Sequence, residues 1–389
     1  MPPNHSLQPF GPSIFAEMSR LAALHGAVNL AQGFPDFDGP PHVKQAAIEA
    51  INAGHGQYAR SAGLPALTHV IADWFTASTG LPADPERHVT VTAGCTEAIA
   101  AAFLGLLNPG DEVVLFEPYY DSYRACVAMA GGIARCVTLR GPDFRIDESE
   151  LSRAFTPRTR LLLLNTPHNP TGRVFSRDEM NAVARLCHKH NVAAIADEVY
   201  ERLVFEPAAT PHTPLASLPG MADRTLTLSS LGKTFSLTGW KIGWAVGPEP
   251  LTSALRAAHQ FLTFAVSTPM QHAAAVALRS PPDYFRNFLA EYRERRDLLA
   301  AALRDLGFRF HDPEGSYFIY ADHTPVSSKL GLKDDVAFCT HLIEKVGVAA
   351  IPPTSFYENK REGARYVRFA FCKKLETLRA AIDRLQALR

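Results

Sequence analysis

The chain has no net charge, no long apolar run and no basic leader, and each absence removes a class of function. Its 39 lysines and arginines balance 39 aspartates and glutamates, so no overall field favours nucleic acid or an anionic membrane. The longest apolar run, at 98–107, is about half of a membrane span. No lysine or arginine precedes Arg20, so we expect neither a signal peptide nor a transit sequence. These features predict a soluble, cytoplasmic protein.

The cysteines and histidines lack the spacing of disulfide frameworks and metal sites. The 15 histidines contain no H-E-x-x-H motif, and the six cysteines contain no C-x-x-C pair. The cysteines are Cys95, Cys126, Cys136, Cys187, Cys339 and Cys372. We therefore expect reduced thiols and no metal. A length of 389 residues with 47% apolar content suits one large globular domain and a smaller one.

The stretch TLTLSSLGKTFSLTGWKIG, at 225–243, carries the strongest chemical signal. An alternating apolar run predicts the end of a buried strand, and Gly232 and Lys233 follow it directly. Such a lysine either belongs to a phosphate-binding P-loop or forms an imine with a carbonyl cofactor. The P-loop pattern needs a glycine where the chain has Thr227. The imine interpretation remains.

SLGKTF at 230–235, followed by TGWKIG at 238–243, resembles the cofactor-lysine motif of class I aminotransferases, which are pyridoxal 5'-phosphate enzymes of fold type I. The similarity runs from Phe15 to the C-terminus. It is greatest to the branch of kynurenine aminotransferases, glutamine transaminase K and bacterial methionine aminotransferases. The resemblance implies that Lys233 holds pyridoxal phosphate as an imine, with Asp197 and Tyr200 as the other catalytic residues.

A second motif, VTVTAGCT at 89–96, predicts a strand and a glycine turn before a helix over 97–107. Free N–H groups and the helix dipole make such a turn an anion site, although similar turns occur without a ligand. The resemblance assigns the cofactor phosphate to Gly94, Cys95, Thr96, Ser230 and Lys241. Cys95 departs from the small residue common at this position.

Polar and aromatic residues follow three expected strands, at 112–116, 160–165 and 192–196. The carboxyl ends of parallel strands share one edge of a sheet, where ligands bind. The resemblance implies that Tyr120 stacks on the cofactor ring, that Asn169 and Tyr200 contact its phenolic oxygen, and that Asp197 holds the proton of its ring nitrogen. Tyr119 and Tyr123 are expected to be wall or core residues. Locally, Asn169 also fits an Asn-Pro turn and Asp197 a helix N-cap.

The segment YVRFAF, at 366–371, places an arginine among apolar neighbours. Arg368 is suited to bind a carboxylate through two N–H groups, and a structural salt bridge is the alternative. The resemblance assigns Arg368, Asn169 and Gly33 to the substrate, although Gly33 also fits a plain turn. Candidates for an apolar wall are Phe15, Phe34 and Phe264. No second arginine lies in a matched motif, which predicts neutral substrates: methionine, glutamine, aromatic amino acids or kynurenine.

The resemblance also implies a homodimer with shared active sites. In this arrangement Tyr58 reaches the phosphate of the neighbouring subunit, and the region of Phe264 lines the neighbour's substrate pocket. A local packing role is the simpler alternative for Tyr58. The expected small-molecule partners are an amino acid and a 2-oxo acid.

Alternating strands and helices over 90–228 predict an α/β fold with a mostly parallel sheet covered by helices. Pro281 and Pro282 mark a composition break. We therefore expect a large cofactor-binding domain at 46–280, and a small α+β domain formed by 281–389 with the N-terminal arm, 1–45. Two alternative activities remain open, those of a cysteine-S-conjugate β-lyase and of an N-succinyldiaminopimelate-type aminotransferase.

Overall fold

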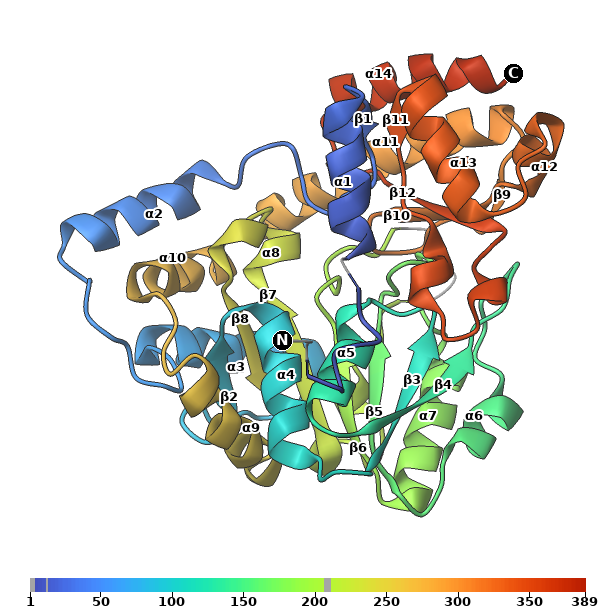
Figure 1. The fold of residues 1–389 in the computed structure, drawn as a ribbon. Coiled ribbons are helices and arrows are strands. Elements are labelled where there is room, and N and C mark those ends of the chain that lie inside the picture. Colours follow the sequence, from blue (N-terminus) through green and yellow to red (C-terminus); the bar gives the residue numbers. More distant parts are fainter. Residues whose placement is uncertain (1–3, 12, 206–210) are drawn as a thin grey trace.

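The computed structural model describes residues 4–11, 13–205 and 211–389. A broad central sheet with helices around it forms the larger part, and a smaller group of helices and short strands stands at one end of it (Figure 1). The C-terminus lies in the smaller part, while the N-terminal segment runs back across the larger one (Figure 1).

The central sheet has seven strands in the order β2-β8-β7-β6-β5-β3-β4. Their bounds are β2 Val89–Thr92, β3 Glu112–Glu117, β4 Ile133–Thr138, β5 Thr159–Asn165, β6 Ala193–Asp197, β7 Thr225–Ser230 and β8 Gly243–Val246. Only β8 runs antiparallel to its neighbours, β2 and β7. The predicted α/β fold with a mostly parallel sheet is confirmed.

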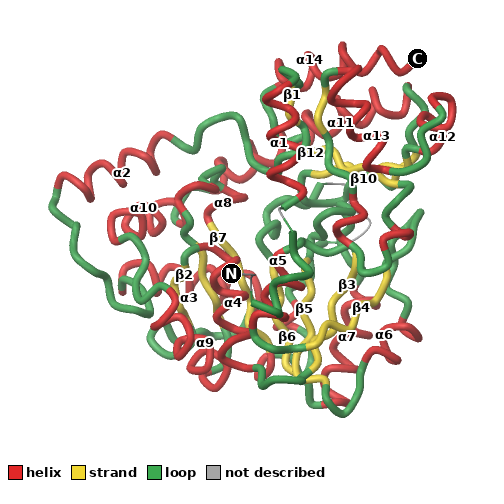
Figure 2. Tube along the Cα trace, viewed as in Figure 1, coloured by secondary structure: helices red, strands yellow, loops and turns green. Residues whose placement is uncertain are grey.

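Strand β5 shows why the sheet is covered on both faces. Leu161 and Leu163 belong to the apolar cluster on one face, while Leu162 and Leu164 belong to the cluster on the other. Side chains alternate along a strand, so a continuous leucine run needs apolar cover on both sides. Helices supply this cover on each face (Figure 2).

The helices of the larger part fall into three groups. The cluster on one face of the sheet includes α4 Gly94–Leu106, α5 Ser122–Met129 and α9 Glu249–Leu262. The opposite cluster includes α6 Glu148–Ala154 and α7 Arg177–His190. Beside β2 and β8 pack α2 Pro41–Asn52, α3 Pro65–Thr79 and α10 Thr268–Leu278. The short helix α8, Leu231–Thr234, follows β7 directly.

The smaller part contains a three-stranded antiparallel sheet, in which β10 pairs with both β9 and β12, and a parallel pair, β1 with β11. The strands are β1 Val28–Asn29, β9 Arg309–Phe310, β10 Phe318–Asp322, β11 Val348–Ala349 and β12 Tyr366–Ala370. The helices are α1 Ile14–Leu24, α11 Pro282–Asp305, α12 Thr324–Ser327, α13 Asp335–His341 and α14 Leu375–Leu385. Strand β1 thus ties the N-terminal segment to the C-terminal part. In the described part of the chain, no helix is long and apolar enough to cross a membrane.

One helix boundary differs from the sequence-based expectation. Helix α4 begins at Gly94, whereas the apolar pattern predicted a start at Glu97. The first turn of a helix needs no apolar face, so periodicity cannot locate it. The backbone N–H groups of Gly94, Cys95 and Thr96 therefore belong to the helix N-terminus itself, where intrahelical acceptors are missing.

Candidate active site

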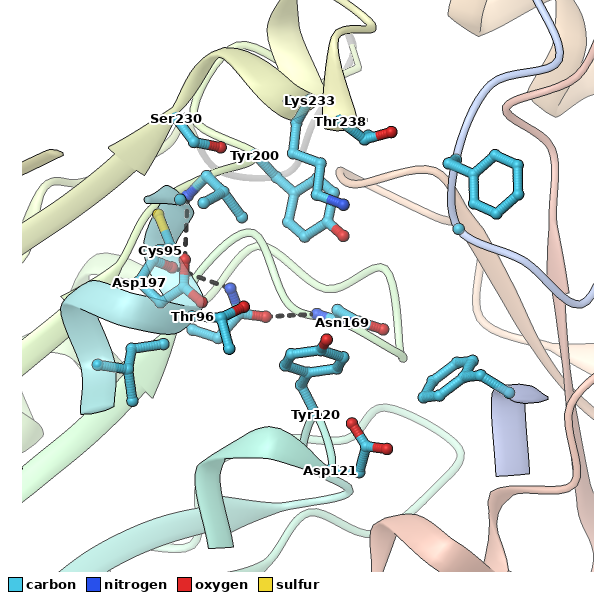
Figure 3. Close-up of a pocket in the computed structure, with 18 of the residues that line it drawn as sticks. Cys95, Thr96, Tyr120, Asp121, Asn169, Asp197, Tyr200, Ser230, Lys233 and Thr238 are labelled. Atoms are coloured by element: carbon cyan, nitrogen blue, oxygen red, sulfur yellow. Dashed lines mark hydrogen bonds between the residues drawn. The ribbon is translucent and has the colours of Figure 1, made fainter. Parts of the chain in front are cut away.

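A cavity of about 400 Å³ opens where β3, β5, β6 and β7 end. Most of the site residues predicted from the sequence line it: Phe15, Gly33, Gly94, Cys95, Thr96, Tyr120, Asn169, Asp197, Tyr200, Ser230, Lys233, Lys241 and Arg368. Phe34 lines it as well. Figure 3 shows many of these side chains turned toward a common space. The fold therefore brings residues from distant parts of the sequence to one place.

Lys233 enters the cavity from α8, one turn beyond the end of β7. Its Nζ donates a hydrogen bond of 2.9 Å to the hydroxyl of Tyr317, which donates in turn to the carbonyl of Gly33. Burial lowers the pKa of the Lys233 ammonium, because desolvation disfavours the charged form. The amine is thus held in place and more readily becomes the neutral form, which can accept a proton.

Asp197 ends β6 on the floor of the cavity and is 5% exposed. Burial raises the pKa of its carboxyl group, and the hydrogen bond from Tyr123 opposes this rise. The Tyr123 hydroxyl lies 2.6 Å from Asp197 Oδ2. Tyr123 is buried and lines the cavity, as predicted for a wall or core residue. In addition, it supplies from α5 the donor that a buried carboxylate needs.

Asn169 is held in place by Asn165, which the sequence analysis did not single out. Asn165 Nδ2 donates to the backbone carbonyl of Asp197 at 2.9 Å, and its Oδ1 accepts from the backbone N–H of Asn169 at 2.7 Å. Figure 3 shows these contacts as dashed lines. Asn165 thereby joins the ends of β5 and β6 and fixes the loop that presents Asn169.

Arg368 lies on β12 and is 1% exposed. Its guanidinium donates to Asn169 Oδ1 at 3.1 Å and to the Ala31 carbonyl at 2.9 Å, while its Nε has no hydrogen-bond partner in the described ranges. No carboxylate forms a salt bridge with it among the described residues. Burial lowers its pKa to about 10, so it stays charged at neutral pH. Asp121, on the same cavity wall, acts on this cation electrostatically but forms no salt bridge with it. A buried cation with no carboxylate in direct contact is costly, which indicates that a ligand supplies one.

Aromatic rings surround the Arg368 guanidinium. Its central carbon lies 4.1 Å from the ring centre of Phe318, 5.0 Å from that of Phe15 and 5.4 Å from that of Phe356. Gly33 faces the same wall, because a Cβ on it would lie 2.8 Å from the Phe318 ring. The rings exclude water and leave an apolar surface next to the cation.

The N-terminus of α4 forms the other end of the cavity. No side chain caps it, since Ala93 precedes Gly94 and makes no side-chain cap bond. Lys241 lies next to it: a Cβ on Gly94 would be 3.2 Å from Lys241 Nζ. Within the described ranges, Lys241 has no acidic partner. Free N–H groups, a helix dipole and an unpaired ammonium together suit a phosphate group.

Tyr58 and Phe264 do not line the cavity of their own chain. They lie on the surface with exposed fractions of 83% and 47%, and their rings meet edge to face at 5.3 Å. Exposed aromatic side chains of this size are typical of interaction surfaces.

The sequence reasoning missed three residues that position the site: Tyr317, Tyr123 and Asn165. Asn165 and Tyr123 lie in the segments NTPHNPTG, at 165–172, and EPYYDSY, at 117–123. These segments also contain the predicted site residues Asn169 and Tyr120, so proximity in sequence could have pointed to both. Tyr317 lies 84 residues from Lys233 in the sequence, and no local pattern links the two.

Comparison with known proteins places the chain in a family over almost its whole length. Residues 26–385 match the family described as aminotransferase class I and II. A structure of N-succinyldiaminopimelate aminotransferase from Mycobacterium tuberculosis is 48% identical, with a TM-score of 0.95 and full coverage of both chains. A structure from Escherichia coli, reported with a methionine aminotransferase function, is 40% identical, with a TM-score of 0.94 and full coverage of both chains.

A third relative widens the range of activities found among similar proteins. Kynurenine–oxoglutarate transaminase of Dictyostelium discoideum is 38% identical, and the match covers 100% of this chain and 96% of that protein. The fold, the cavity and these similarities agree. The chain belongs to the class I and II aminotransferases and is a pyridoxal-phosphate-dependent transaminase of fold type I.

Proposed function

We propose that this enzyme moves the amino group of a neutral amino acid, such as methionine, glutamine, an aromatic amino acid or kynurenine, to a 2-oxo acid. The observation that carries the proposal is Arg368, a buried guanidinium that forms no salt bridge with any described carboxylate and lies among aromatic rings. An α-carboxylate would satisfy the cation, and an apolar or aromatic side chain would lie against the rings.

The cavity suits pyridoxal phosphate at three points. The uncapped α4 N-terminus with Lys241 fits the phosphate, Asp197 at the floor fits a protonated ring nitrogen, and the Lys233 amine fits the aldehyde carbon. We assign the phosphate to Gly94, Cys95, Thr96, Ser230 and Lys241, the ring face to Tyr120, and the phenolic oxygen to Asn169 and Tyr200. When bound, the cofactor supplies an electron sink for breaking a bond at the substrate's Cα.

The protein's own groups then move protons and hold charge. Lys233 Nζ would take the proton from the substrate Cα and deliver it to the aldehyde carbon of the cofactor, and its depressed pKa favours the neutral amine that this needs. Asp197 holds a proton on the ring nitrogen, with Tyr123 fixing the carboxylate. Arg368 and Asn169 hold the α-carboxylate and so orient the Cα–H bond.

We also propose a cytoplasmic homodimer in which Tyr58 and Phe264 serve the site of the partner subunit. Their exposure and their absence from their own cavity support this. Free cysteines throughout the described chain suit a reducing compartment.

For the division into domains, we keep the predicted boundary near residue 280, between α10 and α11. The proposed boundary at 45/46 falls inside α2, which packs along α10, so we propose instead that the division lies just before Pro41.

A panel of amino acids against several 2-oxo acids tests the proposal. We expect methionine, glutamine, phenylalanine or kynurenine to give the highest kcat/KM, with the cofactor absorbance reporting the first half-reaction. Aspartate as the best donor would contradict it.

Two other activities remain candidates. The 48% identity to the tuberculosis enzyme favours N-succinyldiaminopimelate as a substrate to include in the panel. β-Elimination on cysteine S-conjugates uses the same removal of the Cα proton, and the release of ammonia and pyruvate without a 2-oxo acid would reveal it.

A further inference from the structure

Tyr317 contacts the catalytic lysine from behind the cavity. It directly precedes β10, is fully buried, and is not one of the residues that line the cavity. Its hydroxyl accepts a hydrogen bond of 2.9 Å from Lys233 Nζ, the one hydrogen bond that this amine forms within the described ranges. A ligand in the cavity meets Lys233 and not Tyr317, so Tyr317 influences the reaction only through the groups that it holds.

The hydroxyl of Tyr317 can only accept from Lys233. A phenolic hydroxyl carries one proton, and Tyr317 donates this proton to the backbone carbonyl of Gly33. Burial raises the pKa of Tyr317 well above its usual value of 10, because apolar surroundings disfavour the phenolate. The proton therefore stays in place at neutral pH, and the hydrogen bonds run in one direction, from the amine to the hydroxyl to the carbonyl.

Two tyrosine rings enclose the amine. Lys233 Nζ lies 5.5 Å from the ring centre of Tyr317 and 5.6 Å from that of Tyr200, and the two rings meet edge to face at 5.1 Å. Figure 3 shows the end of Lys233 beside Tyr200. The faces of aromatic rings attract a cation, so this position suits the amine before it takes up a proton and the ammonium afterwards.

The other end of these hydrogen bonds is a backbone segment that lines the cavity. Gly33 and Phe34 both belong to the cavity wall. Tyr317 binds the carbonyl of Gly33, and Lys373 Nζ donates to the carbonyl of Phe34 at 2.7 Å. Ser316, directly before Tyr317, is fully buried and has a left-handed φ of 59°. Residues other than glycine rarely adopt this conformation, and such strain is concentrated at functional sites.

We propose that Tyr317 is a positioning residue for the proton transfer at the substrate Cα. By holding one N–H of Lys233, its hydroxyl keeps the lone pair of the amine free to accept the Cα proton, while the electron pair of the C–H bond passes to the electron sink that the cofactor supplies. The amine gains the proton and becomes an ammonium, which the hydroxyl and the two rings continue to hold. The inference rests on the proposed role of Lys233 and does not depend on which amino acid is the donor.

The test compares the wild-type holoenzyme with Tyr317→Phe, which keeps the ring and removes the hydroxyl. The first half-reaction is followed in single turnovers through the cofactor absorbance, with methionine and with methionine deuterated at Cα. We expect the rate at saturation to fall about tenfold, which corresponds to about 1.4 kcal/mol, at an unchanged half-saturating concentration. The isotope effect should be at least as large as in the wild type, because the slowed step breaks the Cα–H bond. An unchanged rate, or an isotope effect that falls toward one, overturns the proposal.

A second readout uses the full chain without cofactor and involves no turnover. Acetic anhydride modifies neutral amines, so the pH dependence of acetylation on the Lys233 peptide reports the pKa of this lysine. A hydrogen-bond acceptor stabilises the ammonium more than the neutral amine, so Tyr317→Phe should move the profile to lower pH. A profile that stays in place or moves to higher pH overturns the proposal, because the hydroxyl would then not hold the amine.

Tyr320→Phe is the matched control. It removes a buried tyrosine hydroxyl from β10, but this hydroxyl lies 3.1 Å from that of Tyr357, and Tyr320 does not line the cavity. Both readouts should keep their wild-type values. A fall in rate equal to that of Tyr317→Phe overturns the proposal, because any lost hydroxyl near β10 would then suffice.

If Tyr317→Phe does not fold, 3-fluorotyrosine at position 317 takes its place. The hydroxyl stays but becomes a weaker acceptor, so smaller changes in the same directions are expected. No change in either readout overturns the proposal.

The result is distinguishable from failure of the proposed function. If the amino acid panel favours aspartate, the preference for neutral donors is wrong. The comparison is then made with aspartate and the same result is expected, because every donor gives up its Cα proton to the same amine. The acetylation readout needs no donor, and it tests the contact between Tyr317 and Lys233 whatever the substrate.

Discussion

The cavity and the Tyr58–Phe264 pair differ in how far a single chain completes them. In the cavity, two buried catalytic groups have partners within the chain: Asp197 has Tyr123, and Lys233 has Tyr317. On the surface, Tyr58 is 83% exposed and touches another exposed ring. The chain thus preorganises the chemical centre by itself, whereas the exposed Tyr58–Phe264 pair is the part that we propose serves a partner subunit.

The largest effect is expected in the cavity, from Lys233→Ala. We expect transamination to be lost completely, because no other amine occupies its place beside Tyr317. In the wild-type holoenzyme, borohydride reduction followed by peptide mapping should find the cofactor on the peptide of Lys233. A label on the peptide of Lys241 would show that the wrong lysine has been assigned.

Asp197→Asn should give the next largest effect. The amide cannot stabilise a proton on the ring nitrogen, so we expect the rate to fall by roughly 10²–10⁴-fold, the range of a positioned acid–base group. The cofactor should stay bound, as its absorbance will show. Near-normal turnover would mean that Asp197 has only a structural role.

Arg368→Ala should raise KM for every amino acid by a similar factor, about tenfold to a hundredfold, as expected for the loss of one charge-assisted carboxylate contact. Arg368→Lys is the matched variant, since it keeps the charge but loses the planar pair of donors. Steady-state kinetics with methionine, glutamine and phenylalanine measure the effect. If only one of them is affected, Arg368 recognises side chains instead.

Mixing two inactive variants tests the role of the exposed Tyr58–Phe264 pair. A Tyr58→Ala, Phe264→Ala double variant is combined with Lys233→Ala under conditions that allow subunit exchange. If the sites are shared, one site of each mixed dimer is intact, and random exchange should restore about a quarter of wild-type activity. Activity that stays at the average of the two parents would place Tyr58 and Phe264 in the site of their own subunit.

The smallest effect is expected at His259, which joins α9 to α4 and to the loop before α3. Its Nδ1 lies 2.9 Å from Glu97 Oε1 and its Nε2 lies 3.0 Å from the Ser61 carbonyl. Both partners are acceptors, so the ring must carry both protons. Burial opposes the charge, but the contacts with Glu97 and Ser61 outweigh it, and the pKa of His259 is raised despite the nearby Arg256.

A raised folded-state pKa means that this stabilisation is complete below the usual value of 6.5 and is lost as the pH rises through the higher folded value. Wild-type protein should therefore lose on the order of 1 kcal/mol of unfolding free energy, as one buried contact is lost, when the pH rises from below 6.5 to above the raised pKa of His259. His259→Gln should lack this part of the pH dependence in denaturant unfolding. An identical pH profile in both proteins would show that the ring is neutral.

The sequence by itself determined the parallel strands that lead to the site and the order of the motifs. The leucine run of β5 required a strand that is covered on both faces. The prolines that follow, Pro167 and Pro170, required this strand to end at the edge of the sheet. The glycine and lysine after β7 were enough to point to a cofactor lysine. These features are local, since periodicity and turn residues act over a few positions.

Only the tertiary structure decided which groups meet. Tyr317 reaches Lys233 across 84 residues of sequence, Arg368 reaches Asn169 across 199, and Ser13 reaches Asp121 across 108. The start of α4 and the contact of Tyr123 with Asp197 were also beyond local pattern. The physical reason is that a hydrogen bond or a missing counter-charge depends on distance in space, and the packing of the two parts sets that distance.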